Sequence, residues 1–230
     1  MTDQGPGLDF SMVIASTVHD MKNALAALIQ AHGTWLAQLP EAHRGTLEQG
    51  VIDYEFAHLN GMLVQLLGLY KLGVNQLPLR PDYHELDDFI EAQLAFHQEV
   101  LGSRGITARY TVDDFGLPGF FDRELIGSVV SNVLINAIRF ARREVLISAG
   151  QVDGQLVIRI NDDGPGFPER MLDEQGDYAL GINQSSGSTG LGLYFAANIA
   201  SQHQRHEVQG HIELANGGEL GGGLFSIYLP

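Results

Sequence analysis

Residues 122–161 read DRELIGSVVSNVLINAIRFARREVLISAGQVDGQLVIRIN and contain two kinds of apolar periodicity. Up to about residue 141 the apolar side chains recur at helical spacing, which predicts a long amphipathic helix. Two β-rich runs, 144–149 and 155–161, follow and flank a Val-Asp-Gly sequence typical of a hairpin turn. A helix followed by a hairpin in one core predicts an α+β fold, with helices on one face of a mixed sheet.

The elements on either side of this stretch extend the same domain. A glycine-rich loop precedes a helix that should begin near Thr189. The remaining elements expected are a helical region at roughly 85–101 and strands at roughly 106–112, 211–214 and 224–229.

The first third of the chain is different, because its apolar residues follow a heptad spacing. They are Ile14, Val18, Met21, Leu25, Leu28, Trp35 and Leu39, then Ile52, Phe56, Leu59, Leu63, Leu66 and Tyr70. We expect two helices in an antiparallel hairpin that pairs with a second copy into a four-helix bundle, which makes the protein a homodimer. A coiled-coil spacer without chemistry would show the same periodicity.

The domain boundary falls in the aperiodic, proline-containing run VNQLPLRPD at 74–82. The two domains are therefore expected at 1–77 and 78–230. His32 interrupts the apolar spacing of the first helix, and we expect an imidazole hydrogen-bonded inside the bundle.

Composition excludes several kinds of protein. The 230 residues include no cysteine and carry a formal net charge of -15. Disulfides, thiolate zinc sites and thiol nucleophiles are therefore absent, and an acidic surface disfavours binding to nucleic acid. No run approaches the roughly 20 apolar residues of a membrane-spanning helix, and no basic residue precedes Lys22. These features predict a cytoplasmic protein without membrane insertion.

The first motif is HDMKN at 19–23, in the middle of the first predicted helix. His19 follows the apolar position Val18, so it should lie at the edge of the bundle, where a neutral imidazole can meet solvent and a partner. Asp20 could hold one ring nitrogen and leave the other as a nucleophile, and Asn23 lies one turn further on the same face. By itself, a histidine on a helix is most often a polar surface residue.

The second motif is NVLINAIRF at 132–140. Asn132 and Asn136 are four residues apart and share a helical face, and their amide oxygens suit a hard cation such as Mg²⁺. Arg139 could meet a phosphate, and Phe140 follows it. Buried or capping asparagines would fit the same spacing.

The third motif is DDGPG at 162–166, at the end of a predicted strand. Gly164 and Gly166 let the backbone pass close to a flat ligand, while Asp162 accepts a hydrogen bond from an exocyclic amine. A simple tight turn is the competing interpretation, since these residues are turn formers.

The fourth motif is GSTGLGL at 187–193, which opens a predicted helix. Glycines before a helix expose amide groups, and the positive end of the helix dipole favours a polyphosphate. The motif lacks the lysine of a P-loop, and no strand directly precedes it, which excludes a Rossmann fingerprint.

The order of the four motifs is more specific than any one of them. Together with the heptad helices and a closing GGGLFSIYLP, they resemble the catalytic core of the sensor histidine kinases of two-component signalling. The resemblance runs from about residue 8 to the end of the chain. It implies a dimerisation and phosphoacceptor domain followed by a Bergerat-type ATP-binding domain.

The resemblance also implies roles for single residues. His19 is similar to the phosphoacceptor, Asp20 to the acidic neighbour that activates it, and Asn23 to the residue that orients water when the regulator is dephosphorylated. Asn136 resembles the Mg²⁺ ligand and Asn132 its support. The residues implied to contact ATP elsewhere are Arg139 at the phosphates, Phe140 near the base, Asp162 with Gly164 and Gly166 at the adenine, and Thr189, Gly190, Leu191 and Gly192 as the phosphate-facing loop.

The residue at position 132 also distinguishes two reactions of ATP, phosphoryl transfer to histidine and hydrolysis. Related ATPases of the gyrase, heat-shock-chaperone and mismatch-repair type carry a glutamate at this position, as the base that activates water. An amide cannot take a proton at neutral pH, so transfer to histidine is favoured over hydrolysis. Phosphoryl transfer needs positioning and charge neutralisation, which amides, Mg²⁺ and one arginine can supply.

The favoured function is a cytoplasmic histidine kinase that phosphorylates His19 from Mg-ATP and passes the group to an aspartate of a response regulator receiver domain. No input domain is readable, so a separate sensor or input protein is expected as a partner. A histidine phosphotransferase or regulator phosphatase would fit Asn23 and the acidic residues within 167–186. A dimeric scaffold that senses nucleotide would not need His19.

His203 and His206 have the H-x-x-H spacing of a metal pair. Because the sequence shows no third ligand, a solvated helix end is the favoured interpretation.

Overall fold

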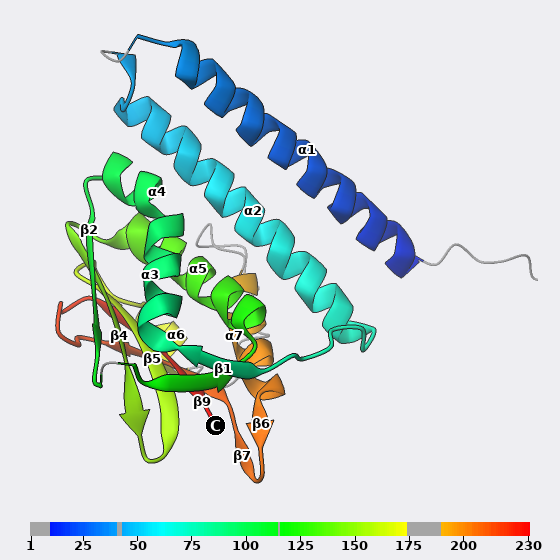
Figure 1. Cartoon of the computed structure of the whole chain (residues 1–230), viewed down its shortest axis with the longest axis vertical. Coiled ribbons are helices and arrows are strands. Elements are labelled where there is room, and N and C mark those ends of the chain that lie inside the picture. Colours follow the sequence, from blue (N-terminus) through cyan, green and yellow to red (C-terminus); the bar gives the residue numbers. More distant parts are fainter. Residues whose placement is uncertain (1–9, 41–42, 115, 174–189) are drawn as a thin grey trace, which may run out of the picture.

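The protein consists of a long helical hairpin and an α+β domain (Figure 1). The computed structural model describes residues 10–40, 43–114, 116–173 and 190–230. In this part of the chain, no helix combines the length and apolar character that crossing a membrane requires.

The hairpin is formed by α1 (Phe10–Gln38) and α2 (Leu47–Gly73). Thr46 caps α2, and its side chain accepts a hydrogen bond from the backbone N–H of Gln49 at 3.2 Å. The two predicted helices are confirmed.

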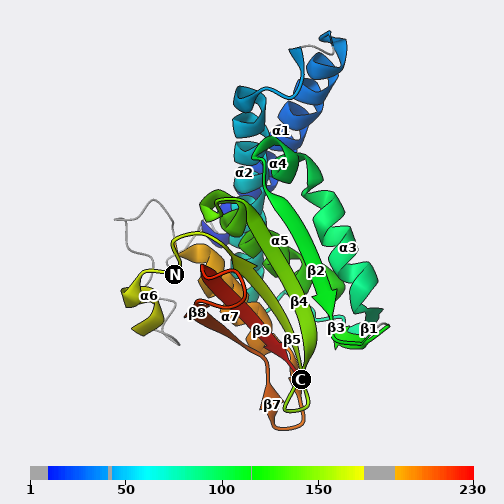
Figure 2. The same cartoon turned by 90° about the vertical axis from the view of Figure 1, so that its left-hand side faces the viewer.

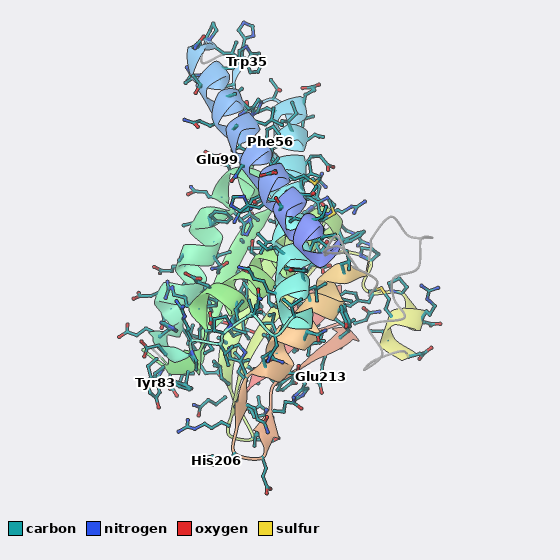
Figure 3. The ribbon with its side chains drawn as sticks, turned by 90° about the vertical axis from the view of Figure 1, so that its right-hand side faces the viewer. Trp35, Phe56, Tyr83, Glu99, His206 and Glu213 are labelled. Carbon is teal, nitrogen blue, oxygen red and sulfur yellow. The ribbon has the colours of Figure 1, made fainter. Side chains whose placement is uncertain are left out.

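The heptad positions of the two helices divide between two surfaces. Val18 and Leu25 are buried within the hairpin. Six others are exposed at seven-residue intervals, Met21, Leu28 and Trp35 on α1 and Ile52, Leu59 and Leu66 on α2, while the rest are half-buried. Each helix therefore keeps an apolar row that a single hairpin does not cover. Figure 3 shows Trp35 near the connecting end of the hairpin.

His32 lies inside the hairpin, as expected, between the rings of Trp35 and Phe56. Its Nδ1 is 3.6 Å from Asp53 Oδ1 on α2, which is ion-pair distance. The expected hydrogen bond is not found, since Nε2 is buried without a partner in the described residues.

A five-stranded mixed sheet forms the centre of the domain, in the order β2-β4-β5-β9-β8. The edge strand β2 (Thr107–Val112) runs parallel to β4 (Glu144–Val152), and the other pairs are antiparallel. β9 (Gly223–Leu229) lies in the interior between β5 (Gln155–Asp162) and β8 (His211–Asn216). The predicted α+β fold is confirmed.

The β4–β5 connection is a tight turn, as its sequence predicts. Asp153 and Gly154 both adopt positive φ, 51° and 79°, the conformation that favours Asp-Gly in two-residue hairpin loops.

Helices cover one face of the sheet (Figure 2). They are α3 (Leu86–Phe96), α5 (Arg123–Phe140) and α7 (Leu191–Gln202), with the short α4 (Gln98–Ser103) after α3. Apolar side chains of α5 and of the inward rows of the sheet are fully buried between the layers, among them Ile126, Leu134, Ile138, Ile147 and Ile158.

Three smaller features were not predicted. β1 (Asp82–Glu85) pairs with β3 (Pro118–Phe121), and β6 (Gln204–Arg205) pairs with β7 (Val208–Gln209). The short helix α6 (Glu169–Asp173) follows β5.

The interpretation of His203 as part of a solvated helix end is wrong. Its side chain is buried, with Nδ1 2.9 Å from the Ile199 carbonyl oxygen, and its Nε2 accepts the backbone N–H of Asp122 at 3.0 Å. The chain folds back through β6 and β7 and covers the helix end. His206 lies at the far tip of that hairpin (Figure 3), and the described residues hold no histidine and carboxylate cluster fit for a metal.

Candidate functional site

The helices α5 and α7 meet at two of the predicted motifs. A Cβ on Gly192, in the first turn of α7, would lie 2.5 Å from Asn132 Nδ2, so only glycine permits this approach. Gly190 precedes the helix with a φ of 64°, a conformation that glycine adopts without strain. Leu191 begins the helix, whereas Thr189 lies outside the described residues. Segments distant in sequence thus share one corner.

Asn132 is also held by the hairpin. Its Oδ1 accepts a hydrogen bond from Gln65 Nε2 of α2 at 2.5 Å. Its Nδ2 is buried and has no hydrogen-bond partner among the described residues. Asn136 lies one turn further along α5 and is half-buried. The contribution of α2 was not predicted, because Gln65 lies among apolar residues and belongs to no motif.

The end of α5 packs against the DDGPG loop. A Cβ on Gly164 would lie 2.5 Å from the carbonyl oxygen of Phe140, so the two backbones approach directly. The Phe140 ring is half exposed, and the guanidinium carbon of Arg139 lies 5.4 Å from the ring centroid. An aromatic face and a positive charge therefore flank this loop.

Asp162 is buried at the end of β5. Its Oδ1 accepts the backbone N–H groups of Gly164 at 2.7 Å and Gly223 at 3.3 Å. Burial raises the pKa of Asp162, although these two hydrogen bonds act in the opposite direction. The second oxygen, Oδ2, would lie 2.8 Å from a Cβ at position 223, so a glycine is needed there too.

Asp163 fixes the loop that follows α5. Its Oδ1 accepts the backbone N–H groups of Arg142, Arg143 and Glu144 at 2.7, 3.1 and 3.3 Å. Partial desolvation acts to raise the pKa of Asp163, but these hydrogen bonds outweigh it and lower the pKa.

Two asparagines that sequence reasoning missed hold the loops around Asp162. Asn161 donates to the carbonyl oxygens of Gly217 and Gly223 and accepts the N–H of Leu220, which fixes the glycine-rich turn before β9. Asn216 bonds the N–H and the carbonyl oxygen of Phe167 at 2.6 and 2.8 Å. The sequence signal that could have indicated them is their position, since Asn161 directly precedes Asp162 and Asn216 directly precedes a pair of glycines.

His19 lies on α1 with an exposed side chain. Asn23 Nδ2 is 3.2 Å from its Nδ1, and Asp20 Oδ1 is 3.9 Å from the same nitrogen. The structure brings these three residues together, but α2 stands between α1 and the domain, so His19 does not reach the corner formed by α5 and α7 (Figure 1).

Residues 121–230 match the family model described as histidine kinase-, DNA gyrase B- and HSP90-like ATPase. The domain that holds Asn132, Asp162 and Gly192 therefore belongs to this class of ATPase.

Comparisons over more of the chain point to one branch of the class. The sensor histidine kinase YkoH of Bacillus subtilis is 28% identical over 195 residues, which are 80% of this chain and 41% of that protein. The signal transduction histidine-protein kinase AfsQ2 of Streptomyces coelicolor is 25% identical over 94% of this chain and 41% of its own length. Full-length ShkA in complex with AMPPNP shares the fold, with a TM-score of 0.64 at 20% identity, over 96% of this chain and 46% of that one.

Together these similarities support a histidine kinase catalytic core. It spans about two-fifths of the length of the two curated relatives.

Proposed function

We propose that this chain is an ATP-dependent protein-histidine kinase, with an ATP-binding domain over 78–230 and the phosphoacceptor His19 in a domain over 1–77. The observation that carries the proposal is the corner that α5 forms with its neighbours. Its Asn132 meets Gly192 at the glycine-capped N-terminus of α7, and its Phe140 meets Gly164 in the loop after the buried carboxylate of Asp162. Such a corner offers an acceptor for a base and donors for phosphates.

At the base end, Asp162 is the proposed adenine acceptor. Its Oδ1 is occupied by two backbone N–H groups, so Oδ2 is the oxygen left to accept the exocyclic amine. Gly164 and Gly166 allow the backbone to approach the ring, and the half-exposed ring of Phe140 offers an apolar face.

At the phosphate end, the residues fit a Mg²⁺-bound triphosphate. The Nδ2 of Asn132, which has no partner in the part of the chain that the structure describes, is a donor for a phosphate oxygen, and Asn136 offers an amide oxygen to the metal. Mg²⁺ would supply charge neutralisation between the phosphates. Arg139 adds a positive charge, and residues 190–192 present amide groups at the N-terminus of α7.

His19 attacks through the ring nitrogen that carries no proton. The Asp20 carboxylate, 3.9 Å from Nδ1, would stabilise a proton on that nitrogen and leave Nε2 as the nucleophile. In this tautomer the Asn23 amide, whose Nδ2 now lies 3.2 Å from Nδ1, turns its oxygen toward that nitrogen. A bond forms between Nε2 and the γ-phosphorus while the bond to the ADP oxygen breaks. Asn132 offers no base for water, which favours this transfer over hydrolysis.

The proposed partners are a second copy of the chain and a response regulator. The exposed rows on α1 and α2, at heptad spacing, favour a homodimeric four-helix bundle because a second hairpin would bury them. The receiver domain of a regulator would then accept the phosphoryl group on an aspartate. The cytoplasmic location stays a prediction.

The test is incubation with Mg-ATP. The wild type should gain an acid-labile phosphoryl group, and His19→Gln should gain none. His43→Gln, an exposed histidine in the hairpin connection, is the matched control and should label like the wild type. An unlabelled wild type, or equal labelling of His19→Gln, would falsify the proposal.

A regulator phosphatase is a second candidate, because Asn23 lies 3.2 Å from the His19 ring and could orient water there. Asn23→Ala should slow dephosphorylation of a phosphorylated receiver domain while autophosphorylation continues. Tight, Mg-dependent binding of a non-hydrolysable ATP analogue would argue against a decayed kinase step. A nucleotide-sensing scaffold predicts instead that His19→Ala keeps signalling intact.

A further inference from the structure

The turn between β8 and β9 lies against the outer face of the sheet, away from the helices. Residues 217–222 form this turn, which we call the strap. Val145 and Ile147 of β4 belong to the core under the helices, so the side chain of Leu146, between them, lies on the opposite face. Leu146 is nevertheless only 3% exposed. A segment other than the helices therefore covers the sheet at this point.

Two anchors on either side of Leu146 hold the strap. In the sheet, Leu146 lies between Arg109 of β2 and Asn161 of β5. Arg109 Nη2 donates to Glu219 Oε1 at 2.7 Å, and Asn161 Oδ1 accepts the N–H of Leu220 at 2.7 Å. The strap thus crosses Leu146 from one neighbouring strand to the other, which accounts for the burial of this side chain.

Asn161 also holds the residue that follows the strap. It is 3% exposed, and its Nδ2 donates to the carbonyl oxygen of Gly223 at 2.7 Å and to that of Gly217 at 3.2 Å. The N–H of Gly223 donates to Asp162 Oδ1 at 3.3 Å. Two adjacent side chains of β5 therefore clamp Gly223, one by its carbonyl oxygen and the other by its N–H.

This clamp decides which oxygen of Asp162 is left for a ligand. The N–H of Gly164 comes from the loop after Asp162, whereas the N–H of Gly223 is delivered by the strap, and both donate to Oδ1. A Cβ at position 223 would lie 2.8 Å from Oδ2, so a small shift of this residue would also close the space beside that oxygen. An acceptor that is fixed before the ligand arrives needs no further ordering on binding.

We infer that Asn161 and the strap determine the selectivity for the base, because they fix Asp162 Oδ2 as the acceptor for an exocyclic amine. The inference rests on the proposed function, and Asn161 acts through Gly223 as a positioning residue. A purine without the amine leaves Oδ2 unpaired and gains nothing from its orientation. Release of the strap should therefore weaken binding of the amine-bearing base and leave binding of an amine-free analogue unchanged.

The clamp can be tested without nucleotide, by amide hydrogen exchange of the full chain followed by NMR. Asn161→Ala should raise the exchange rate of the Gly223 N–H by about tenfold or more, while the amides of β4 and α5 exchange as in the wild type. Asn198→Ala is the matched control, because the Asn198 amide donates to the Tyr194 carbonyl oxygen within α7. Unchanged exchange at Gly223 in Asn161→Ala would overturn the clamp.

A second variant covers the case in which Asn161→Ala disturbs the whole domain. Glu219→Gln removes the ion pair of the exposed end of the strap with Arg109 and leaves Asn161 in place. It should raise exchange at Gly223 in the same direction by a smaller factor. Exchange at Gly223 equal to that of the wild type would then overturn the strap as its support.

Selectivity is measured by calorimetry with Mg-ADP and with the Mg complex of purine riboside 5′-diphosphate, which differs only by lacking the exocyclic amine. The wild type and Asn198→Ala should bind ADP about tenfold more tightly than the analogue, the effect of one hydrogen bond to a charged group. In Asn161→Ala this preference should fall to about twofold or less, through weaker binding of ADP alone.

The outcomes separate the inference from the proposed function. An undiminished preference for ADP in Asn161→Ala, or an equal loss of affinity for both ligands, would overturn the role of Asn161 and leave the proposed function standing. A wild type that binds neither ligand would overturn the proposed function and the selectivity together, whereas exchange at Gly223 still decides whether the clamp exists.

Discussion

The hairpin and the ATP-binding domain bury their apolar residues to very different extents. In the hairpin only Val18, Leu25 and Tyr54 are buried apolar side chains of the described helices, while the heptad rows lie open. In the domain, α5 alone contributes nine buried residues. The domain therefore has a core of its own, whereas the hairpin depends on surfaces outside itself, with the domain on one side of α2 and, we propose, a second copy on the heptad rows.

The largest expected effect comes from the core. Leu134→Ala removes a fully buried side chain of α5 and should lower the free energy of unfolding by about 2–5 kcal/mol. The same change at Leu28, 58% exposed on α1, should cost well under about 1 kcal/mol in the monomer. Urea denaturation followed by circular dichroism measures both. Equal losses of unfolding free energy in the two variants would contradict the difference in burial between domain and hairpin.

Acid should weaken the domain more than the hairpin. His97 is buried with its Nε2 2.8 Å from Ser131 Oγ, and burial lowers its pKa to about 4. An unfolded histidine titrates near about 6.5, so below that pH the unfolded chain binds a proton that the folded chain does not. The contribution of neutral His97 to stability is complete above that pH. The free energy of unfolding should fall by up to about 3 kcal/mol as the pH decreases to 4. Burial of His203 lowers its pKa in the same direction.

The measurement is the free energy of unfolding between pH 7.5 and 5. His97→Gln should flatten its pH dependence, and His43→Gln should leave it unchanged. A pH dependence in His97→Gln identical to that of the wild type would refute the assignment.

The smallest expected losses of stability come from substitutions at two helix N-caps, one in the domain and one in the hairpin. Asp122 caps α5 through the N–H groups of Glu124 and Leu125, and it also accepts the N–H of Arg80 from another segment. Thr46 caps α2 through one exposed hydrogen bond. Asp122→Ala should cost about 2 kcal/mol and Thr46→Ala about 0.5–1 kcal/mol in thermal denaturation. The reverse order would mean that the hairpin is the better supported of the two regions.

The sequence predicted the long elements of the fold because their periodicity is local. The helix α5 and the strands β4 and β5 each repeat their pattern over several residues. The strands β1 and β3 were not predicted, because strands of four residues show little periodicity. They also pair across a long separation in sequence. His203 was misread for the same reason, because the segment that covers it comes later in the chain.

For the candidate site, glycines were informative where the backbone needs them. Gly190 with its positive φ, and Gly164 and Gly192 with no room for a Cβ, follow from turn chemistry that a sequence displays. Gln65 could not be found this way. A glutamine in an apolar heptad run looks like a surface residue until the domain is placed against α2.

The position of β9 bears on how the protein is made. Residues 223–229 form an interior strand, so β8 can pair with the sheet only through them. During synthesis, α1 and α2 can pair as soon as they leave the ribosome, because their contacts are close in sequence. The sheet cannot close until residues 223–229 have emerged, so the ATP-binding domain folds only after these residues have been translated. Deleting 223–229 should therefore yield an aggregating chain rather than a shortened enzyme.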